Sequence, residues 1–344
     1  MRLLRIILFP LALLYGVIVY LRNLLYDKEI FKSTRFDTPT ICVGNIALGG
    51  TGKTPMIELL IKYYVAKGKK VVVLSRGYGR ATKGLIHAEP TSSPADIGDE
   101  PKQLLEAFPM IDIVVCADRV HAMQYVEKKI KPDLVLLDDA FQHRAIKAQF
   151  NILLTTYNKP YFNDFYLPAG TLRDHQLRVK KAQVVVVTKS PDHIDATKKA
   201  SFVSGLNLMP NQPVFFSHLK YDNILVGLNK SISLNNLKGQ EITLVTAIAN
   251  PEPLVCFLEK QGIIIHHLRY ADHHYFSRNE IESLKKHQKI ICTHKDFVKL
   301  STAIPQLFYL PVSHDFIERE KHIFYRALPE IRANNRTLYS SSSS

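Results

Sequence analysis

Residues 40–55 read TICVGNIALGGTGKTP, and this stretch decides the fold that we expect. The β-branched run over 40–45 predicts a short buried strand, and apolar residues recur at helical spacing from Lys53 to Lys67. A glycine-rich turn joins the two. A strand, a glycine turn and a helix in this order are typical of the first unit of a nucleotide-binding α/β domain. Pro55 suits the first helical turn, where its missing N–H costs little.

The glycine turn carries most of the phosphate-loop pattern G-x-x-x-x-G-K-[ST]. Ala47 stands where the first glycine belongs, while Gly49 and Gly50 supply backbone freedom. In such loops the backbone N–H groups wrap the phosphates, the lysine reaches the β and γ phosphates, and the hydroxyl ligates Mg²⁺. The alternative is a glycine turn used only for tight packing. We expect ATP to be bound by Ala47, Leu48, Gly49, Gly50, Thr51, Gly52, Lys53 and Thr54.

The rest of the chain alternates apolar strands with helices. Continuous apolar runs predict parallel strands covered on both faces, and they lie at 70–75, 111–117, 133–139, 150–156 and 182–189. We therefore expect a P-loop NTPase-like, doubly wound α/β fold with a mostly parallel sheet, followed by a second, smaller α/β domain. The predicted segments are a membrane-attached helix (1–30), the P-loop core domain (31–210), a linker or hairpin (211–240), the smaller domain (241–335) and a polar tail (336–344).

Composition and charge narrow the class of protein and its partners. The 344 residues are 46% hydrophobic and 22% charged, which excludes a disordered chain. The net charge of +14 favours anionic partners, but no dense basic tract with stacking aromatics is present, so we expect no nucleic acid. Cys42, Cys116, Cys256 and Cys292 lie far apart without a C-x-x-C pair. We expect buried, reduced thiols, with a metal or disulfide set as the alternative.

The first 26 residues are the exception to a soluble pattern. The run from Ile6 to Leu21 has no charged residue, and basic residues stand on both sides of it. It ends without a small-residue cleavage site, which argues against a signal peptide, and it is somewhat short for a membrane span of about 20 residues. We predict a membrane-attached helix that either spans marginally or lies in the interface. A buried N-terminal core helix is the alternative.

Two aspartates follow a buried strand downstream of the glycine loop. The segment from Leu134 to Asp139 reads LVLLDD, and an apolar strand that ends in an acid is how a Walker B carboxylate reaches Mg²⁺. Asp138 and Asp139 are therefore metal-ligand candidates together with Thr54. A cap on the following helix is the alternative for one member of the pair.

Three further motifs carry polar side chains suited to phosphate chemistry. RGYGR over 76–80 places two arginines among flexible glycines, where they could stabilise phosphate charge. DIGDEP places Asp99 and Glu100 at the start of a helix, where acids are also favoured without any catalytic role. Asp272-His273-His274 follows a strand of the smaller domain, and a histidine beside an acid can act as a general base. No further ligands lie at a regular zinc-site spacing.

The ordered set of motifs resembles the tetraacyldisaccharide 4'-kinase family. VGNIALGGTGKTP, LSRGYGR, GDEP, LLDDAFQHR, LPAGTLRD, ADHHYF and THKDFVKL carry the resemblance, which extends from the apolar N-terminus to about residue 315. It implies transfer of the γ-phosphoryl group of ATP to the 4'-hydroxyl of a tetraacylated glucosamine disaccharide 1-phosphate, which gives lipid IVA in lipid A biosynthesis. The chain departs from the family pattern at Asp174, Ala247 and His294, where Glu, Gly and an acid are usual.

The resemblance also implies roles for individual residues. Asp99 would be the base for the acceptor hydroxyl, with His273 as its partner across the cleft between domains, and Lys53 would hold the β and γ phosphates. The expected catalytic set is Asp99, His273, Lys53, Asp138 and Asp139. Weaker candidates for contacts with the acceptor or the ATP phosphates are Arg76, Arg80, Glu100, Arg119 and Arg173, for which surface ion pairs are the alternative.

The implied location is the cytoplasmic face of the bacterial inner membrane, with the lipid substrate as the partner and no obligatory protein partner. Two other classes remain open on the residues alone. One is a membrane-associated P-loop NTPase switch that hydrolyses nucleotide without a lipid acceptor. The other is a non-catalytic scaffold with a vestigial site, which the intact Lys53, Thr54, Asp138 and Asp139 argue against. ATP is the default nucleotide because the chain lacks an N-K-x-D guanine element.

Overall fold

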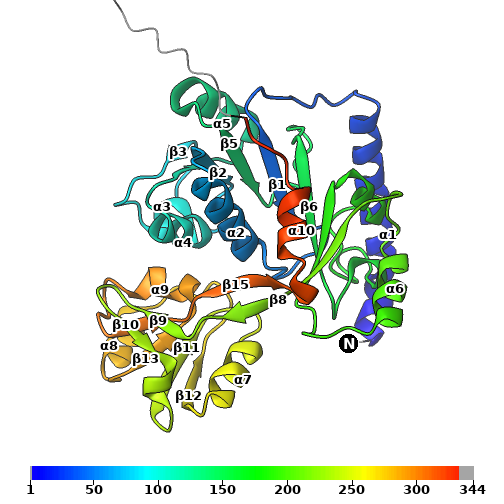
Figure 1. Cartoon of the computed structure of the whole chain (residues 1–344). Helices are drawn as coiled ribbons and strands as arrows, with labels where there is room; N and C mark the ends of the chain where they lie inside the picture. Colours follow the sequence, from blue (N-terminus) through cyan, green and yellow to red (C-terminus); the bar gives the residue numbers. More distant parts are fainter. Residues whose placement is uncertain (1, 333–344) are drawn as a thin grey trace, which may run out of the picture.

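The computed structural model describes residues 2–332, which form two α/β domains and an N-terminal helix (Figure 1). The larger sheet has nine strands in the order β15-β8-β7-β6-β1-β5-β2-β4-β3. The run from β8 to β4 is parallel, and β15 and β3 are antiparallel edge strands. Their bounds are β1 Thr40–Gly44, β2 Val71–Ser75, β3 Ile86–His87, β4 Asp112–Val115, β5 Leu134–Asp138, β6 Phe150–Thr156, β7 Val184–Thr188, β8 Val214–Tyr221 and β15 Val312–Phe316.

Helices cover both faces of this sheet, as continuous apolar strands require. One core contains Leu60 of α2, Leu104 of α4 and Phe324 of α10, and the other contains Met123 of α5. The helices are α2 Lys53–Ala66, α3 Pro94–Ile97, α4 Asp99–Ala107, α5 Arg119–Tyr125 with a π turn at Val126–Ile130, α6 Ala196–Gly205 and α10 Lys321–Ala327. Short 3₁₀ turns lie at Tyr161–Asn163, Gln176–Lys181 and Ile317–Arg319.

The smaller domain is built on a six-stranded sheet in the order β10-β9-β14-β13-β11-β12. Leu254 and Leu258 of α7 pack on one face, and Leu284 of α8 and Phe297 of α9 pack on the other. The bounds are β9 Ile224–Val226, β10 Ser231–Ser233, a 3₁₀ turn Leu234–Leu237, β11 Glu241–Thr246, α7 Glu252–Lys260, β12 Ile264–Arg269, α8 Arg278–Lys285, β13 Ile290–Cys292, α9 His294–Leu300 and β14 Leu307–Tyr309.

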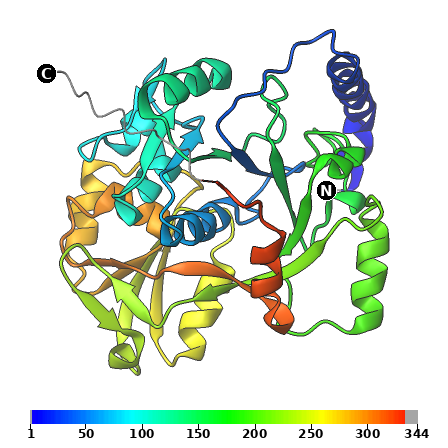
Figure 2. The ribbon, with the colours of Figure 1, turned by 45° about the horizontal axis from the view of Figure 1, so that its top comes forward.

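The segments that join the domains correct the boundaries expected from the sequence. We expected 211–240 to be a linker or hairpin, and β9 and β10 do form an antiparallel pair in the smaller sheet, but β8 pairs with β7 in the larger one. We placed 241–335 in the smaller domain, but β15 pairs with β8, and Phe324 packs against Phe215 in the larger core. The antiparallel pair β8–β15 therefore carries the chain to the smaller domain and back (Figures 1 and 2).

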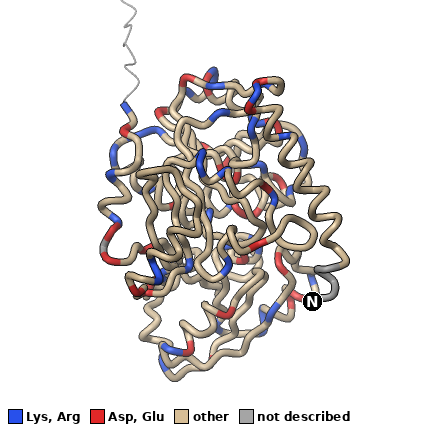
Figure 3. The backbone as a smooth tube through the Cα atoms, turned by 90° about the vertical axis from the view of Figure 1, so that its right-hand side faces the viewer, with Lys and Arg blue, Asp and Glu red and all other residues tan. Residues whose placement is uncertain are grey.

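Helix α1 (Arg2–Asp27) lies along the side of the larger domain that faces away from the smaller one (Figures 1 and 2). A narrow stripe of Ala12, Gly16, Val19 and Asn23 is buried, and Gly16 lies so close to the Tyr166 ring that a Cβ would clash with it. Most other apolar side chains of the helix are exposed, and the charged residues of the helix lie near its two ends (Figure 3). A helix with one buried stripe and exposed apolar faces does not fit the alternative of a buried core helix.

The segment Ile7–Asp27 is long and apolar enough to cross a membrane, with a mean hydropathy of 1.8. Cys42, Cys116 and Cys292 are buried, as expected. The expectation is wrong for Cys256, because its apolar surroundings form α7, whose buried face carries Leu254 and Leu258 and leaves Cys256 exposed. The predicted polar tail 336–344 lies outside the described residues.

Candidate active site

The phosphate loop follows β1 at the carboxyl edge of the larger sheet, where α/β folds bind ligands. Gly49 and Gly52 have φ angles of 121° and 83°, which glycine adopts without a steric penalty. Three segments hold the loop. The Leu48 N–H donates to the Thr171 carbonyl at 2.7 Å, and the Thr188 hydroxyl donates to the Thr51 carbonyl at 2.8 Å. The third segment is β15.

His314 of β15 contacts the backbone of the phosphate loop. Its Nε2 lies 2.9 Å from the Gly52 carbonyl oxygen, and its Nδ1 lies 3.1 Å from the Ser217 hydroxyl. Burial lowers the pKa of His314 to about 4, so the imidazole is neutral near pH 7. A neutral ring that donates from Nε2 to the carbonyl must accept at Nδ1 from Ser217. The sequence offers no motif for this residue.

Asp138 and Asp139 end β5 next to the loop, and their environments differ. Asp138 is buried, its Oδ2 accepts from the Ser75 hydroxyl at 3.2 Å, and its Oδ1 has no hydrogen-bond partner within residues 2–332. Burial, together with the charges of Glu100 and Asp139, raises the pKa of Asp138 to about 7. For Asp139, burial would raise the pKa, but Lys53 and Arg173 outweigh it and hold the pKa below its usual range.

Lys53, the lysine of the loop, faces this acid pair. Its Nζ lies 3.7 Å from Asp139 Oδ2, and Arg173 also forms an ion pair with Asp139. Mg²⁺ prefers hard oxygen ligands, and the buried Asp138 Oδ1 is a carboxylate oxygen without a protein donor. Asp138, Asp139 and the hydroxyl of Thr54 therefore fit a Mg²⁺ site, and the loop amides fit the phosphates of a nucleotide.

The weaker candidates for contacts with the acceptor or the ATP phosphates fall into two groups, those near Asp138 and those that bind only backbone carbonyls. The Arg119 side chain is buried, its Nη2 donates to the Asp138 carbonyl at 2.9 Å, and its Nε and Nη1 have no partner among the described residues. Arg76 and Glu100 lie close enough to act electrostatically on Arg119 and Asp138, respectively. Arg80 instead donates to the backbone carbonyls of Val115 and Gly84 at 3.4 and 2.6 Å, which indicates a structural role for Arg80.

Asp99 and His273 meet across the two domains, as the resemblance implies. Asp99 starts α4 of the larger domain, and His273 lies after β12 of the smaller one in a left-handed conformation, with φ 61°. His273 Nδ1 lies 3.4 Å from Asp99 Oδ2. Two more contacts join the same loops, because the Tyr275 hydroxyl donates to the Gly79 carbonyl at 2.7 Å and the Tyr78 ring packs edge-on against His273.

Sequence reasoning missed two lysines at this junction. Lys299 of α9 lies with its Nζ 2.8 Å from Asp99 Oδ2, and Lys295, one turn earlier, lies with its Nζ 3.0 Å from His273 Nε2. Burial would raise the pKa of Asp99, but the hydrogen bonds from His273 and Lys299 outweigh it and hold this pKa below its usual range. The sequence could have indicated this, because Lys295 and Lys299 are four residues apart and therefore lie on the same face of a helix.

Comparisons with known proteins identify the family of the chain. The model of the family described as Tetraacyldisaccharide-1-P 4'-kinase matches residues 4–329. The tetraacyldisaccharide 4'-kinases of Flavobacterium johnsoniae and Phocaeicola vulgatus are 41% and 37% identical, over 97% and 96% of this chain and 99% and 96% of their own lengths. This chain belongs to the tetraacyldisaccharide-1-P 4'-kinase family. The resemblance drawn from its motifs is confirmed.

The fold class is confirmed by a solved structure of the same family. The structure of LpxK from Aquifex aeolicus in complex with ATP has a TM-score of 0.76 and 28% identity, and the match covers 95% of this chain and all of that chain. The doubly wound, mostly parallel sheet and the second, smaller sheet expected from the sequence are both present.

A family motif also ties α1 to the site. In LPAGTLRD, Arg173 contacts Asp139, while the neighbouring Asp174 is fully buried and accepts from the Asn23 amide of α1 at 2.7 Å. The same segment pairs with the phosphate loop, since the Arg173 N–H donates to the Ile46 carbonyl at 2.9 Å. The apolar helix of this 4'-kinase family member thus contacts Asp174, and the neighbouring residue Arg173 contacts the predicted metal ligand Asp139.

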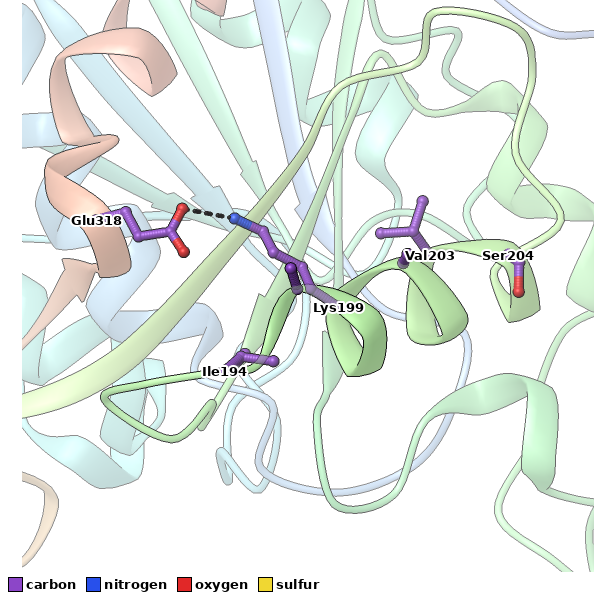
Figure 4. A pocket seen from close by; sticks show the side chains of 7 residues that line it. Ile194, Lys199, Val203, Ser204 and Glu318 are labelled. Carbon is purple, nitrogen blue, oxygen red and sulfur yellow. Dashed lines mark hydrogen bonds and ion pairs between the residues drawn. The ribbon is translucent and has the colours of Figure 1, made fainter.

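A pocket of about 630 Å³ lies apart from the predicted residues, between α6 and the turn after β15. Its lining is mostly apolar, with Ile194 and Val203 in it, and the ion pair of Lys199 with Glu318 at 2.9 Å closes one side (Figure 4). None of the residues that line this pocket belongs to a motif shared with the 4'-kinase family, so we do not place the reaction there.

Proposed function

We propose that this chain transfers the γ-phosphoryl group of ATP to the 4'-hydroxyl of a tetraacyldisaccharide 1-phosphate, which gives lipid IVA. The observation that carries the proposal is the pairing of Asp99 with His273 across the two domains, in a chain that carries a phosphate loop and belongs to the 4'-kinase family. A tetraacyldisaccharide is the substrate in the names of the related proteins. ATP is supported by the ATP complex of the structural relative.

Lys53 and the loop amides bind the β and γ phosphates in this proposal. The flexible Gly49 and Gly52 allow successive N–H groups to face the phosphates, and Lys53 adds positive charge beside them. Arg119 adds a second positive charge near the transferred group through its two unpartnered nitrogens. Thr54, Asp138 and Asp139 would hold Mg²⁺, which, when bound, neutralises charge on the phosphates.

Asp99 takes the proton of the acceptor hydroxyl. Its ion pairs with His273 and Lys299 both involve Oδ2, so Oδ1 is the oxygen that accepts the proton in this proposal. A pKa held below its usual range keeps Asp99 ionised near neutral pH. Because phosphoryl transfer has a loose transition state, the acceptor proton leaves late, and a weak but well-placed base is sufficient.

Helix α1 attaches the enzyme to the cytoplasmic face of the inner membrane in this proposal. The acceptor carries four acyl chains and stays in the bilayer, so the site must work at its surface. The exposed apolar side chains of α1 and the net charge of +14 suit an anionic leaflet. The contact of Asn23 with Asp174 supports the proposal, because it places the helix beside a segment that also contacts the phosphate loop.

The test is label transfer from γ-labelled ATP. Detergent-purified protein, Mg²⁺ and tetraacyldisaccharide 1-phosphate are incubated, and the lipid is separated by thin-layer chromatography. We expect label in the lipid, with a loss of at least about a hundredfold in Lys53→Ala and Asp99→Asn. Glu106→Gln is the matched control, because Glu106 lies on the same helix as Asp99 and only pairs with Lys102 at 3.3 Å.

Free labelled phosphate with no label in the lipid would refute the kinase proposal and favour a membrane-associated NTPase switch. Equal label in the lipid with wild-type protein and Asp99→Asn would retain the kinase but remove Asp99 as the base.

A further inference from the structure

We propose that Lys299 and Lys295 of α9 are positioning residues that set the protonation states of the Asp99–His273 pair, Lys299 by holding Asp99 as a carboxylate and Lys295 by fixing the neutral tautomer of His273. This inference rests on the proposed function, because it assigns a role to residues around the proposed base.

The contacts of Lys299 leave little freedom to its ammonium group. Its Nζ lies 2.8 Å from Asp99 Oδ2, 3.2 Å from the carbonyl oxygen of His274 and 5.7 Å from the centre of the Tyr275 ring. The side chains of Lys299 and Asp99 are 7% and 9% exposed. Solvent screens this pair less than a surface salt bridge, and the loss of one partner would leave an uncompensated charge with little access to water.

Lys299 therefore joins both partners of the proposed base. It binds Asp99 of the larger domain, and it binds the loop of the smaller domain that carries His273, through the next residue in the chain. Removal of Lys299 would leave a buried carboxylate with one weaker partner at 3.4 Å. The position of Asp99 depends on α9 as much as on its own helix.

The contacts of Lys295 determine which nitrogen of His273 carries a proton. Lys295 Nζ lies 3.0 Å from His273 Nε2 and 3.2 Å from Asp272 Oδ1. An ammonium group can only donate, so Nε2 must accept, and the single ring proton lies on Nδ1. Nδ1 then donates to Asp99 Oδ2. In this arrangement His273 donates a hydrogen bond as a neutral ring. Asp99 is then the group that takes the proton from the hydroxyl of the lipid substrate.

The charges that face Asp99 predict the direction of a pH effect. They are Lys299 and Lys295 on α9, Asp272 and His273 on the loop after β12, and Glu100 on α4. An opposite charge in direct contact lowers the pKa of a carboxyl group by about 1–3 units. A neutral residue at position 299 therefore raises the pKa of Asp99, and the active carboxylate is then lost at a higher pH.

The experiment measures the pH profile of kcat/KM for label transfer, with the full chain in detergent. The variants are Lys299→Met, which removes the charge, Lys299→Gln, which keeps a donor but no charge, and Lys299→Arg, which keeps the charge. We expect the acid limb to move up by roughly one pH unit in Lys299→Met and Lys299→Gln and to stay in place in Lys299→Arg. Lys285→Met is the matched control, because Lys285 lies on the surface of the same domain and pairs with Glu282.

A uniform loss of rate without a shift of the acid limb in both neutral variants would overturn the inference, because a purely structural role of Lys299 gives that result. If Lys299→Met does not fold by circular dichroism, Lys299→Gln decides the same question. For Lys295→Met, we expect kcat to fall while KM for ATP stays unchanged, and equal changes in both would overturn its role. Wild-type protein that releases only free phosphate refutes the proposed function instead, so the two failures are distinguishable.

Discussion

The contact of β15 with the phosphate loop makes a quantitative prediction about stability and pH. His314 is fully buried between Gly52 and Ser217, and burial lowers its pKa from the ordinary 6.5 to about 4. The unfolded chain then binds more protons than the folded chain between these two values. The contribution of neutral His314 to stability is therefore complete above about pH 6.5 and is lost as pH falls toward 4.

The magnitude follows from the size of the shift. A difference of about 2.5 pKa units, at about 1.36 kcal/mol per unit, corresponds to roughly 3 kcal/mol when pH falls below both values. At pH 5 the unfolded histidine is almost fully protonated and the folded one is not, so the loss is about 2 kcal/mol relative to pH 7.5. Solvent weakens this contribution little, because His314 is 1% exposed.

The variant His314→Gln isolates this effect. A glutamine amide can still donate to the Gly52 carbonyl, but it does not titrate. Urea unfolding in detergent at pH 7.5 and pH 5.0 should show that wild-type protein loses about 2 kcal/mol more stability than the variant between the two pH values. His193→Gln is the matched control, because His193 is exposed, and its pH dependence should equal that of wild-type protein.

An equal pH dependence in wild-type protein and His314→Gln would refute the reasoning, because it would mean that His314 titrates alike in the folded and unfolded states. A variant that unfolds at both pH values would leave the comparison to Ser217→Ala. That variant keeps the buried imidazole but removes the donor to Nδ1, and it should retain the pH dependence of wild-type protein.

Three further outcomes are expected. Phe324→Ala should lower the free energy of unfolding by about 3–5 kcal/mol in urea, because the side chain is fully buried in the larger core; a loss below about 1 kcal/mol would contradict the assignment of α10 to that core. Asn23→Ala should cost about 1–3 kcal/mol, since it removes the donor to the buried Asp174, and the same unfolding assay measures it. Leu14→Glu should lower co-flotation with anionic vesicles roughly tenfold or more, because Leu14 is exposed on α1, whereas Ile224→Glu in the smaller domain should leave it unchanged.

The parts of the fold that sequence reasoning predicted are those in which a local pattern determines the structure. The strand, glycine loop and helix from Thr40 to Ala66 are neighbours in the chain. A long apolar run also predicts a buried strand, whichever strand it pairs with. The domain boundaries were wrong because they depend on pairing. Nothing in residues 214–221 or 312–316 indicates that these two strands meet, yet their pairing places both in the larger sheet.

The same distinction applies to the site. Lys53, Asp138 and Asp139 belong to short motifs whose order along the chain follows from the fold, so they could be recognised one segment at a time. Lys299 lies within the motif THKDFVKL, but its contact with Asp99 could not be foreseen, because Asp99 lies far away in the sequence. His314 belongs to no motif that the sequence offers. His314 and Gly52 are separated by 262 positions, and their contact exists only because β15 returns to the larger sheet.

The residues missed from the sequence lie at both parts of the proposed reaction. On the nucleotide side, His314 in the middle of β15 contacts the Gly52 carbonyl of the phosphate loop, within the larger domain. On the acceptor side, α9 brings an ammonium group to the buried Asp99. A displacement of the smaller domain therefore alters the environment of the proposed base. Because Ser217 contacts the histidine that holds the phosphate loop, substitutions at Ser217 should change KM for ATP, although Ser217 contacts neither substrate in the proposed reaction.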